Sequence, residues 1–419
     1  MANNLLTISK ITNEALMVLE NELTFASGVV REYDEQFAIT GAKIGNTLNI
    51  RKPARFIGTT GPNLSVEDFN ETSIPLVLTT QFHVDTQFNT QDLALSMDMF
   101  SDRLIKPAVA AIANKIDRDG LVMAKNTTAN IVGVAGNAPT GLITYLTAGA
   151  YLDSEGAPRD GKRQMIVEPF TSAAIVDSLK GLFTPSAKIG EQYEKGMMGR
   201  DAGGMNWKMD QNVVSQTFGS WAGASASTLT YPTSTMAGAL TAGWASTSSI
   251  TLTAGASLTL VQGDVIQIAG VYAVNPQNRQ AYGSGKLRNF VVGTGATGTT
   301  LAITVSPAII TGGQFQNVQI IGATSATATV TPFSAGLSGA GVTSPQNIMH
   351  HRNAYALGSA DLEVPAGVHF AGRASDKETG MSIRIVRQYT VNNDAIPTRL
   401  DVLYGWAPLY PELACRVAA

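Results

Sequence analysis

The sequence predicts an α+β fold that carries an inserted antiparallel β-barrel, and three observations lead to this prediction. The stretch Asp98–Thr128 has the spacing of one long amphipathic helix. Short runs in which apolar and polar residues alternate indicate strands along most of the remaining chain. Residues 215–345 hold only four charged residues, and the composition found before them resumes after residue 345. That return favours an insertion into one domain over a module at its end.

The N-terminal part of the chain predicts two helices. The long helix gathers its apolar residues on one face, at Ile105, Val109, Ile112, Ile116 and Met123. Pro107 either kinks this helix or begins its main part, because proline has no backbone N–H to donate. Residues 5–27 also keep a helical period and stop at Ser27-Gly28. This first helix is either part of the core or an arm that docks on a neighbouring subunit.

Between these helices the sequence predicts an extended β-arm. Residues 46–57 form one strand or hairpin arm, residues 58–72 are polar and rich in turn residues, and Ile74–Gln87 returns as a second strand. A segment this short cannot bury its own apolar side chains. We therefore expect the arm to need a partner surface.

The second half of the chain is predicted to consist mainly of strands. Arg163–Val167 and the Met205, Trp207, Met209 alternation predict strands, with a helix at Thr171–Phe183 between them. The barrel runs are Ser249–Leu252, Leu258–Leu260, Val265–Ala269, Asn289–Val292, Thr300–Val305 and Val318–Ile321. Finally, Met381–Val391 and Thr398–Trp406 form an antiparallel hairpin that turns at Asn392-Asn393-Asp394.

The composition excludes several classes of protein. A net charge of −3 predicts no strong attraction to nucleic acid or to anionic membranes. A single cysteine, Cys415, excludes an internal disulfide framework. We find no signal peptide and no apolar run long enough for a membrane span, so we expect folding in a cytoplasm.

The motifs that could carry chemistry have simpler explanations. Gly293–Gly298 matches a dinucleotide-binding pattern, but a strand-like run follows it where a helix is required, so a hairpin turn is expected. The histidines His83, His350, His351 and His369 lack metal-ligand spacing, and Cys415 has no flanking nucleophile motif. The carboxylate pairs Glu67/Asp68, Asp117/Asp119 and Glu191/Glu194 are typical of solvated faces and helix charge pairs. We therefore expect no catalytic residue, cofactor or metal site, and no enzyme.

The C-terminal block carries a resemblance to a known family. Asn347–Arg416 contains HRNAYALGSADLEVPAGVHFAGRA and then SIRIVRQYTVNNDAIPTRLDVLYGWAPLYPELACRV. GDVIQIAGVYAVNPQNRQ at Gly263–Gln280 and GKLRNFVV at Gly285–Val292 add to it. These stretches resemble the major coat (capsid) proteins of tailed double-stranded DNA bacteriophages, of the short-tailed-phage type with an inserted β-domain.

The resemblance implies seven segments. They are an N-terminal arm at 1–45, an extended β-loop at 46–90, a peripheral domain with its spine helix at 91–160, the first part of an axial domain at 161–214, the inserted β-barrel domain at 215–345, the second part of the axial domain at 346–395, and a return to the peripheral sheet at 396–419.

The resemblance also implies a function and its partners. Such subunits form pentamers and hexamers that close into an icosahedral shell around packaged double-stranded DNA, which is held without sequence specificity. The implied partners are a scaffolding protein that guides a precursor shell, a portal protein and a decoration protein, with no membrane. Assembly would take place in the cytoplasm of the host bacterium, and the product would be the virion capsid.

Some alternatives stay open at this point. Residues 215–345 could instead be a tail or surface β-module that binds carbohydrate, and residues 163–212 could belong to an α/β enzyme. The uncharged stretch Ser225–Ser248 could bridge capsomers through Trp244, Tyr231 and Leu240. Lys52 could enter a lysine–asparagine crosslink, but no acceptor or acid is marked, so we do not expect one.

Overall fold

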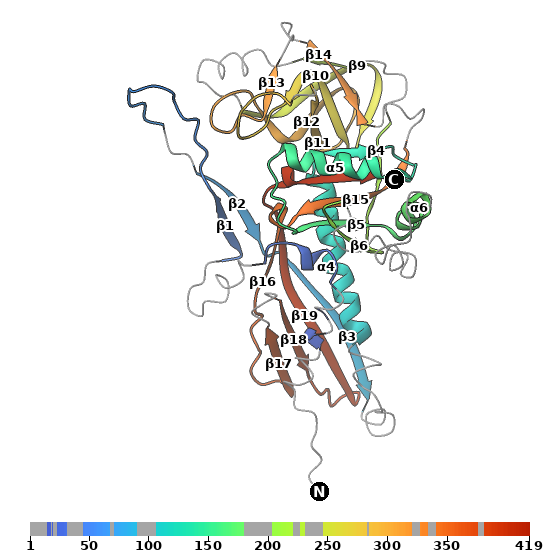
Figure 1. Cartoon of the computed structure of the whole chain (residues 1–419). Coiled ribbons are helices and arrows are strands. Elements are labelled where there is room, and N and C mark those ends of the chain that lie inside the picture. Colours follow the sequence, from blue (N-terminus) through green and yellow to red (C-terminus); the bar gives the residue numbers. More distant parts are fainter. Residues whose placement is uncertain are drawn as a thin grey trace. The chain divides into compact units, whose positions relative to one another are not determined.

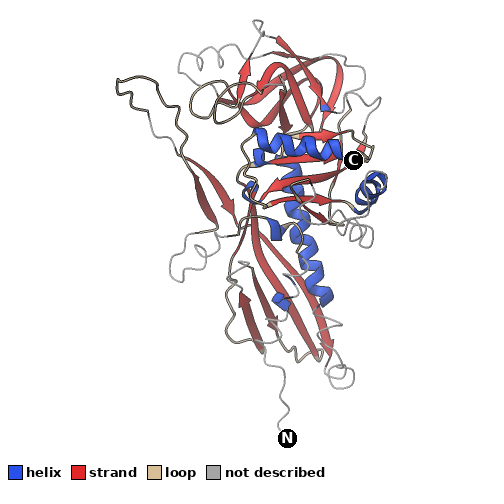
Figure 2. Cartoon of the chain, in the orientation of Figure 1, coloured by secondary structure: helices blue, strands red, loops and turns tan. Residues whose placement is uncertain are grey.

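The chain divides into two compact units. In a computed structural model the described residues are 15–17, 19, 23–31, 45–67, 71–89, 106–179, 203–220, 227–230, 246–282, 285–320, 327–333, 341–375 and 381–419. The first unit comprises Met1–Ile50, Ser73–Leu121 and Tyr355–Leu409. The second comprises Arg51–Thr72, Val122–Ala354 and Tyr410–Ala419. Strands predominate in both units (Figure 2), as the α+β prediction requires.

The first unit is built on an antiparallel sheet. Its order is β16 (Tyr355–Ser359), β19 (Ala395–Pro408), β18 (Ser382–Arg387) and β17 (Phe370–Ser375), and β3 (Thr80–Asn89) also pairs with β19 (Figure 1). The register Arg384↔Asp401 and the turn before Ala395 confirm the predicted C-terminal hairpin. Asp394 in that turn has a φ of 46°, a left-handed conformation that aspartate tolerates better than most residues.

Helix α4 (Lys106–Thr127) confirms the predicted long helix. Val109, Ile112 and Ile116 are fully buried, so the apolar stripe found in the sequence is the packed face. The described part of the helix begins at Lys106 and has Pro107 as its second residue, so the choice between a kink and a helix start at Pro107 stays a prediction. Residues 98–105 of the prediction lie outside the described residues.

The predicted first helix is described only in part. Residues 15–17 and 19 are helical, and Ala15 and Leu19 are fully buried, which favours the core alternative at these positions. A short 3-10 turn, η1 (Ala26–Gly28), follows. Beside it Phe25 packs against two aromatic rings of the first unit, those of Trp406 and Tyr355, at centroid distances of 5.4 and 5.7 Å.

The predicted returning strand is split, which the sequence analysis did not foresee. β1 (Thr47–Lys52) pairs with β2 (Thr72–Val77), whereas the continuation belongs to β3 and the main sheet. A glycine pair explains the break, because Gly358 and Gly405 face each other in β16 and β19. A Cβ on Gly405 would lie 2.1 Å from the carbonyl oxygen of Val77, so the link between β2 and β3 crosses the sheet where no side chain intervenes.

The second unit contains a mixed sheet. Its order is β4 (Ile131–Gly133), β20 (Ala414–Ala418), β15 (Thr343–His351), β5 (Arg163–Val167) and β6 (Asn206–Met209), and β7 (Ser215–Thr217) also pairs with β15. Pairs β4–β20 and β5–β6 are parallel. Helix α5 (Leu142–Ser154) covers a core that includes Tyr145, Leu152, Met165 and Val417. Helix α6 (Pro169–Leu179) follows β5, and two 3-10 turns, η4 (Arg352–Ala354) and η5 (Pro411–Leu413), complete the described elements.

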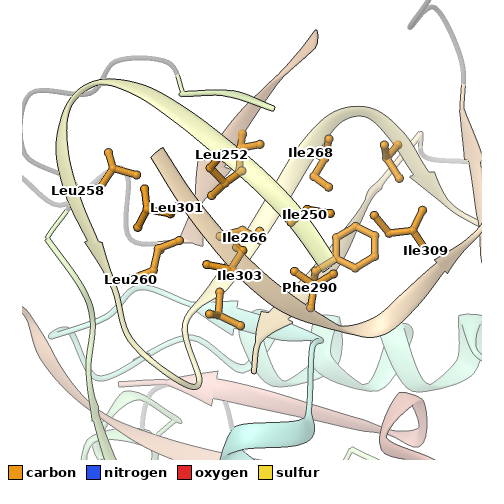
Figure 3. Close-up of a cluster of buried hydrophobic side chains, with 14 of the residues drawn as sticks. Ile250, Leu252, Leu258, Leu260, Ile266, Ile268, Phe290, Leu301, Ile303 and Ile309 are labelled. Carbon is orange, nitrogen blue, oxygen red and sulfur yellow. The ribbon is translucent and has the colours of Figure 1, made fainter. Parts of the chain in front are cut away.

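The charge-poor stretch forms a ring of paired strands within the second unit. These are β8 (Ser227–Thr230), β9 (Ser246–Leu260), β10 (Val265–Ala273), β11 (Leu287–Val292), β12 (Ala296–Ile310) and β14 (Thr327–Pro332), with β13 (Val318–Ile320) on β10. The pairing runs β11-β12-β9-β8-β14-β10 and returns from β10 to β11. Figure 3 shows Ile250, Leu252, Ile266, Phe290 and Ile303 gathered in its interior. Five of the six predicted runs fall within these strands, the first two of them joined in β9, and the sixth coincides with β13 up to Ile320, since residue 321 lies outside the described residues.

The two units group the chain differently from the seven predicted segments. Residues 355–375 share a sheet with β19, whereas 414–418 pair with β15. The sequence analysis had placed residues 346–395 with the axial part and residues 396–419 with the peripheral part. The names peripheral and axial, and the segment boundaries, stay predictions.

Candidate assembly surface

The loop between β1 and β2 exposes apolar side chains. Phe56 and Ile57 are 60% and 51% exposed, and Leu64 and Val66 are 93% and 84% exposed. We call residues 47–77 the arm and residues 53–67 its loop. Isolated exposed apolar residues are ordinary, but a cluster along one loop is a candidate surface for contact with another molecule. The arm predicted from the sequence is therefore present, shortened by the loss of β3.

The loop has a fixed local shape because one carboxylate closes it. Glu67 accepts hydrogen bonds from the backbone N–H groups of Ile57, at 2.7 Å, and Gly58, at 2.5 Å. Gly58 has a φ of 71°, which only glycine adopts at little cost. The closed shape keeps the apolar side chains on the outside of the loop.

Two cations hold the end of β1 and the start of the loop. The Lys52 ammonium lies 4.5 Å from the centroid of the Tyr410 ring, and burial lowers the Lys52 pKa. The Arg55 guanidinium lies 3.8 Å from the carboxylate of Glu412. Lys52, which the sequence analysis considered for a crosslink, thus packs on an aromatic ring. The loop at 225–248, the other predicted contact, lies outside the described residues except for 227–230 and 246–248.

The residues that the sequence analysis considered for catalysis or ligand binding have structural roles. Gly293 and Gly295 lie in the turn from β11 to β12, so a strand follows the glycine motif and the hairpin-turn prediction is confirmed. Cys415 is buried in β20, and burial raises the pKa of its thiol. Among the described residues, no three histidine, cysteine, aspartate or glutamate side chains gather as metal ligands would. None of the described helices is long and apolar enough to cross a membrane.

The four histidines have different surroundings. His350 is fully buried in β15, and burial lowers its pKa to about 4. His351, also buried, has its Nε2 3.1 Å from Asp160 Oδ1. His83 Nδ1 lies 2.9 Å from Asp85 Oδ2 on the same strand. His369 is placed by its backbone N–H, which donates to Gln388.

One carboxylate prediction was wrong. Asp117 was expected on a solvated face, yet it is 1% exposed and accepts backbone N–H groups of Thr24, Phe25 and Ala26. Its partner in the predicted pair, Asp119, does accept from Lys115 in an i, i+4 pair. Because the donors lie more than 90 residues away in the sequence, local spacing could not reveal them. Residues 68, 191 and 194 of the other pairs lie outside the described residues.

Several buried charged groups were missed by the sequence analysis. Arg288 of β11 pairs with Glu155 at the end of α5, and both side chains are about 95% buried. Asp264 accepts from the backbone N–H groups of Val261 and Gly219 and from the Gln216 amide. Arg416 donates to the carbonyl oxygen of Gly263 at 2.9 Å. These groups fasten the barrel to the mixed sheet and show no catalytic arrangement.

One hollow lined by charged groups lies beside the mixed sheet. A cavity of about 510 Å³ is lined by Leu146, Asp153, Arg159, Arg163, Met205 and Met349, among others. Arg163 donates to Asp153 and to the carbonyl oxygens of Ala157 and Pro158. Asp153 also pairs with Arg159, which lowers its pKa. Each charged side chain that lines the cavity is therefore paired with another one that lines it.

Comparison with known proteins decides the family. The family model of the P22 coat protein, gene protein 5, matches residues 1–416 of this 419-residue chain. The chain belongs to the P22 coat protein family. No curated protein matches it. The family implied by the C-terminal block and the α+β fold class are thus confirmed, and this coat protein is a structural protein of a phage capsid.

Solved phage structures also resemble this coat protein. Mycobacterium phage Che8 shares 12% identity over 94% of this chain and 90% of its own, with a TM-score of 0.47. The capsid of cyanophage P-SCSP1u shares 9% identity over 90% of this chain and 84% of its own, with a TM-score of 0.45. The mature capsid of bacteriophage PhiM1 shares 11% identity over 89% of this chain and 82% of its own, with a TM-score of 0.42. Since all three TM-scores are below 0.5, the assignment rests on the family model.

The carbohydrate-binding alternative gains no support from this coat protein's barrel. Sugar platforms need exposed aromatic rings. The aromatic residues described within 215–345 are buried or half-buried: Phe218, Tyr272, Tyr282, Phe290, Phe315 and Phe333. Trp221, Tyr231 and Trp244 lie outside the described residues.

Proposed function

We propose that this coat protein self-assembles through pentamers and hexamers into the icosahedral shell that encloses the phage double-stranded DNA. The family assignment carries the proposal, and the exposed apolar loop supports it. A subunit that leaves Leu64 and Val66 almost fully exposed gains stability when a neighbouring copy covers them. Repeating one such contact from copy to copy extends a closed lattice.

The charge of the chain suits a container for nucleic acid. With a net charge of −3 the protein offers little of the cation–phosphate attraction that gives tight, salt-dependent binding. DNA can then be packed into the shell and leave it again. In this proposal the DNA is held by enclosure, without sequence specificity.

The remaining partners follow from the same proposal. A scaffolding protein guides a precursor shell, a portal protein occupies one vertex, and a decoration protein can bind the finished surface. Assembly takes place in the cytoplasm of the host bacterium, and the protein ends in the virion.

The test is sedimentation with negative-stain imaging of the full chain, alone and co-expressed with the scaffolding protein of the same phage. Closed shells, or sheets and tubes of hexamers, are the expected result. A species of 44.0 kDa in both samples at high concentration would refute the proposal.

Arm variants sharpen this test. Leu64→Asp with Val66→Asp should prevent assembly without changing the unfolding midpoint, because both side chains are exposed in the single subunit. Leu64→Met with Val66→Ile is the matched control, since it keeps apolar surface at the same positions. Normal shells from the aspartate variant would exclude the loop as a contact surface.

A further inference from the structure

One arginine of the barrel reaches the arm. Arg279 follows β10, and its Nη2 donates a hydrogen bond of 2.7 Å to the carbonyl oxygen of Phe56, 223 positions away in the sequence. Phe56 is the residue just before Ile57, where Glu67 closes the loop. The contact therefore fixes the backbone in the first part of the loop, one residue before the point where Glu67 closes it.

The backbone at Arg279 is unusual. Its φ is 56°, and in the described chain only Asp394 shares a positive φ among residues other than glycine. Two side-chain turns hold this conformation, because Asn275 accepts from Gln277 N–H and Asn278 from Gln280 N–H. Glycine or asparagine would adopt the same backbone more easily than arginine does. An arginine at this strained position indicates a functional role for its side chain.

A second contact joins the same two parts. The Arg55 guanidinium carbon lies 6.0 Å from the centroid of the Phe315 ring, in the link between β12 and β13. At this distance the cation lies at the edge of the range for attraction to an aromatic ring. Arg55 also lies near Glu412, as described above. Both barrel contributions, Arg279 and Phe315, thus converge on two consecutive arm residues, Arg55 and Phe56.

We propose that Arg279, Phe315, Arg55 and Phe56 form a clasp that ties the arm of each coat protein subunit to its own inserted barrel. The clasp holds the first part of the loop and leaves its tip uncovered, because the contacts involve Arg55 and Phe56 while Leu64 and Val66 stay exposed. The barrel then has a mechanical role in the subunit. It sets the direction in which the arm presents its apolar side chains, and a displacement of one part is transmitted to the other.

Hydrogen exchange of the unassembled full chain tests the clasp. The probes are the amides of Ile57 and Gly58, which are hydrogen-bonded to Glu67 beside the clasp. Arg279→Asn should raise their exchange rates roughly threefold to tenfold, the range expected when a charged donor is lost from a partly exposed hydrogen bond. Asparagine tolerates the left-handed backbone but is too short to reach Phe56.

The controls separate the clasp from general effects. Lys286→Ala removes one positive charge from an exposed barrel residue and should leave both amides unchanged. Arg279→Gly should behave like Arg279→Asn, so that either variant decides if the other folds poorly. Protection of β10 and β11 amides reports that the barrel is intact. Unchanged exchange in both Arg279 variants, or an equal increase in Lys286→Ala, would overturn the proposal.

This test stands apart from the proposed function. If the wild-type chain formed no shells under any condition, the assembly proposal would fail while the exchange comparison would still decide the clasp. Conversely, the wild-type chain could form shells while the Arg279 variants leave the exchange rates of the arm amides unchanged. That result would support the assembly proposal and reject the clasp.

Discussion

The buried ion pair between Glu155 and Arg288 allows a quantitative test of how the barrel is fastened to the mixed sheet. The two side chains are 5% and 4% exposed, and the residues lie 133 positions apart. Burial raises the pKa of the Glu155 carboxyl, while the guanidinium opposes that shift by favouring the charged form. Replacing Arg288 with methionine removes this opposition and leaves a carboxyl group buried without its cation.

The expected magnitude follows from the burial. Breaking one partner out of a buried pair destabilises by about 3–5 kcal/mol, whereas replacing both partners with apolar residues is often neutral. We therefore expect Arg288→Met to destabilise the second unit by about 3–5 kcal/mol at pH 8. The double variant Glu155→Met/Arg288→Met should stay within about 1–2 kcal/mol of wild type.

The single variant should also depend on pH in a defined direction. In Arg288→Met the folded state has a Glu155 pKa above that of the unfolded chain, so folding takes up a proton. This stability is fully present below the unfolded pKa, about 4.3, and is lost as the pH rises from there through the folded pKa. Arg288→Met should accordingly lie closer to wild type at pH 5 than at pH 8.

Amide exchange of β11 and α5 in increasing urea is the assay. A chain with two compact units need not unfold in one step, so a local probe is required. The reasoning fails if Arg288→Met matches wild type at pH 8, or if the double variant is as unstable as the single one.

Four further predictions follow. Burial lowers the His350 pKa to about 4 from an ordinary 6.5, so stability present above pH 6.5 should fall by about 3 kcal/mol as the pH drops to 4, and His350→Gln should flatten that dependence in acid unfolding curves. Gly405→Ala should prevent folding of the first unit or lower its unfolding midpoint strongly, because its Cβ would meet the carbonyl oxygen of Val77. Asp117→Ala should destabilise the first unit by about 3 kcal/mol in urea, since three backbone N–H groups lose one acceptor. Phe290→Ala should cost about 3–5 kcal/mol by opening a cavity in the barrel core, measured by exchange of β10 amides.

Each of these has a matched comparison. Asp117→Asn keeps one acceptor oxygen and should be less harmful than alanine. Phe290→Leu should lose less than alanine because it leaves a smaller cavity. Gly149→Ala, at a helical position with no atom within 4 Å of the added carbon, should be tolerated where Gly405→Ala is not. An unchanged acid slope in His350→Gln would contradict the assignment of that proton.

Local patterns predicted the elements well. The strand Arg163–Val167 was predicted with the bounds that the structure has. The barrel runs and the C-terminal hairpin were found because alternation between two faces is written into consecutive residues. The long helix was found for the same reason, as was the exposed arm, whose polar and turn-rich centre cannot form a core.

Pairing partners were beyond the reach of such patterns. Nothing in Ile74–Gln87 indicates that it divides at Val77, because the division depends on Gly358 and Gly405, more than 270 residues later in the chain. The assignment of residues 355–375 and 414–418 to different sheets depends likewise on which strands they meet.

The candidate site shows the same division. The sequence by itself determined the α+β class, the charge-poor barrel strands, the arm and, through its resemblance, the coat-protein family. Tertiary structure decided which charges are buried, as for Asp117 and for the pair of Glu155 with Arg288, and it alone brought Arg279 to Phe56. The physical reason is distance along the chain: periodicity reports the few residues on either side of a position, whereas desolvation and long-range hydrogen bonds depend on neighbours that only the folded chain supplies.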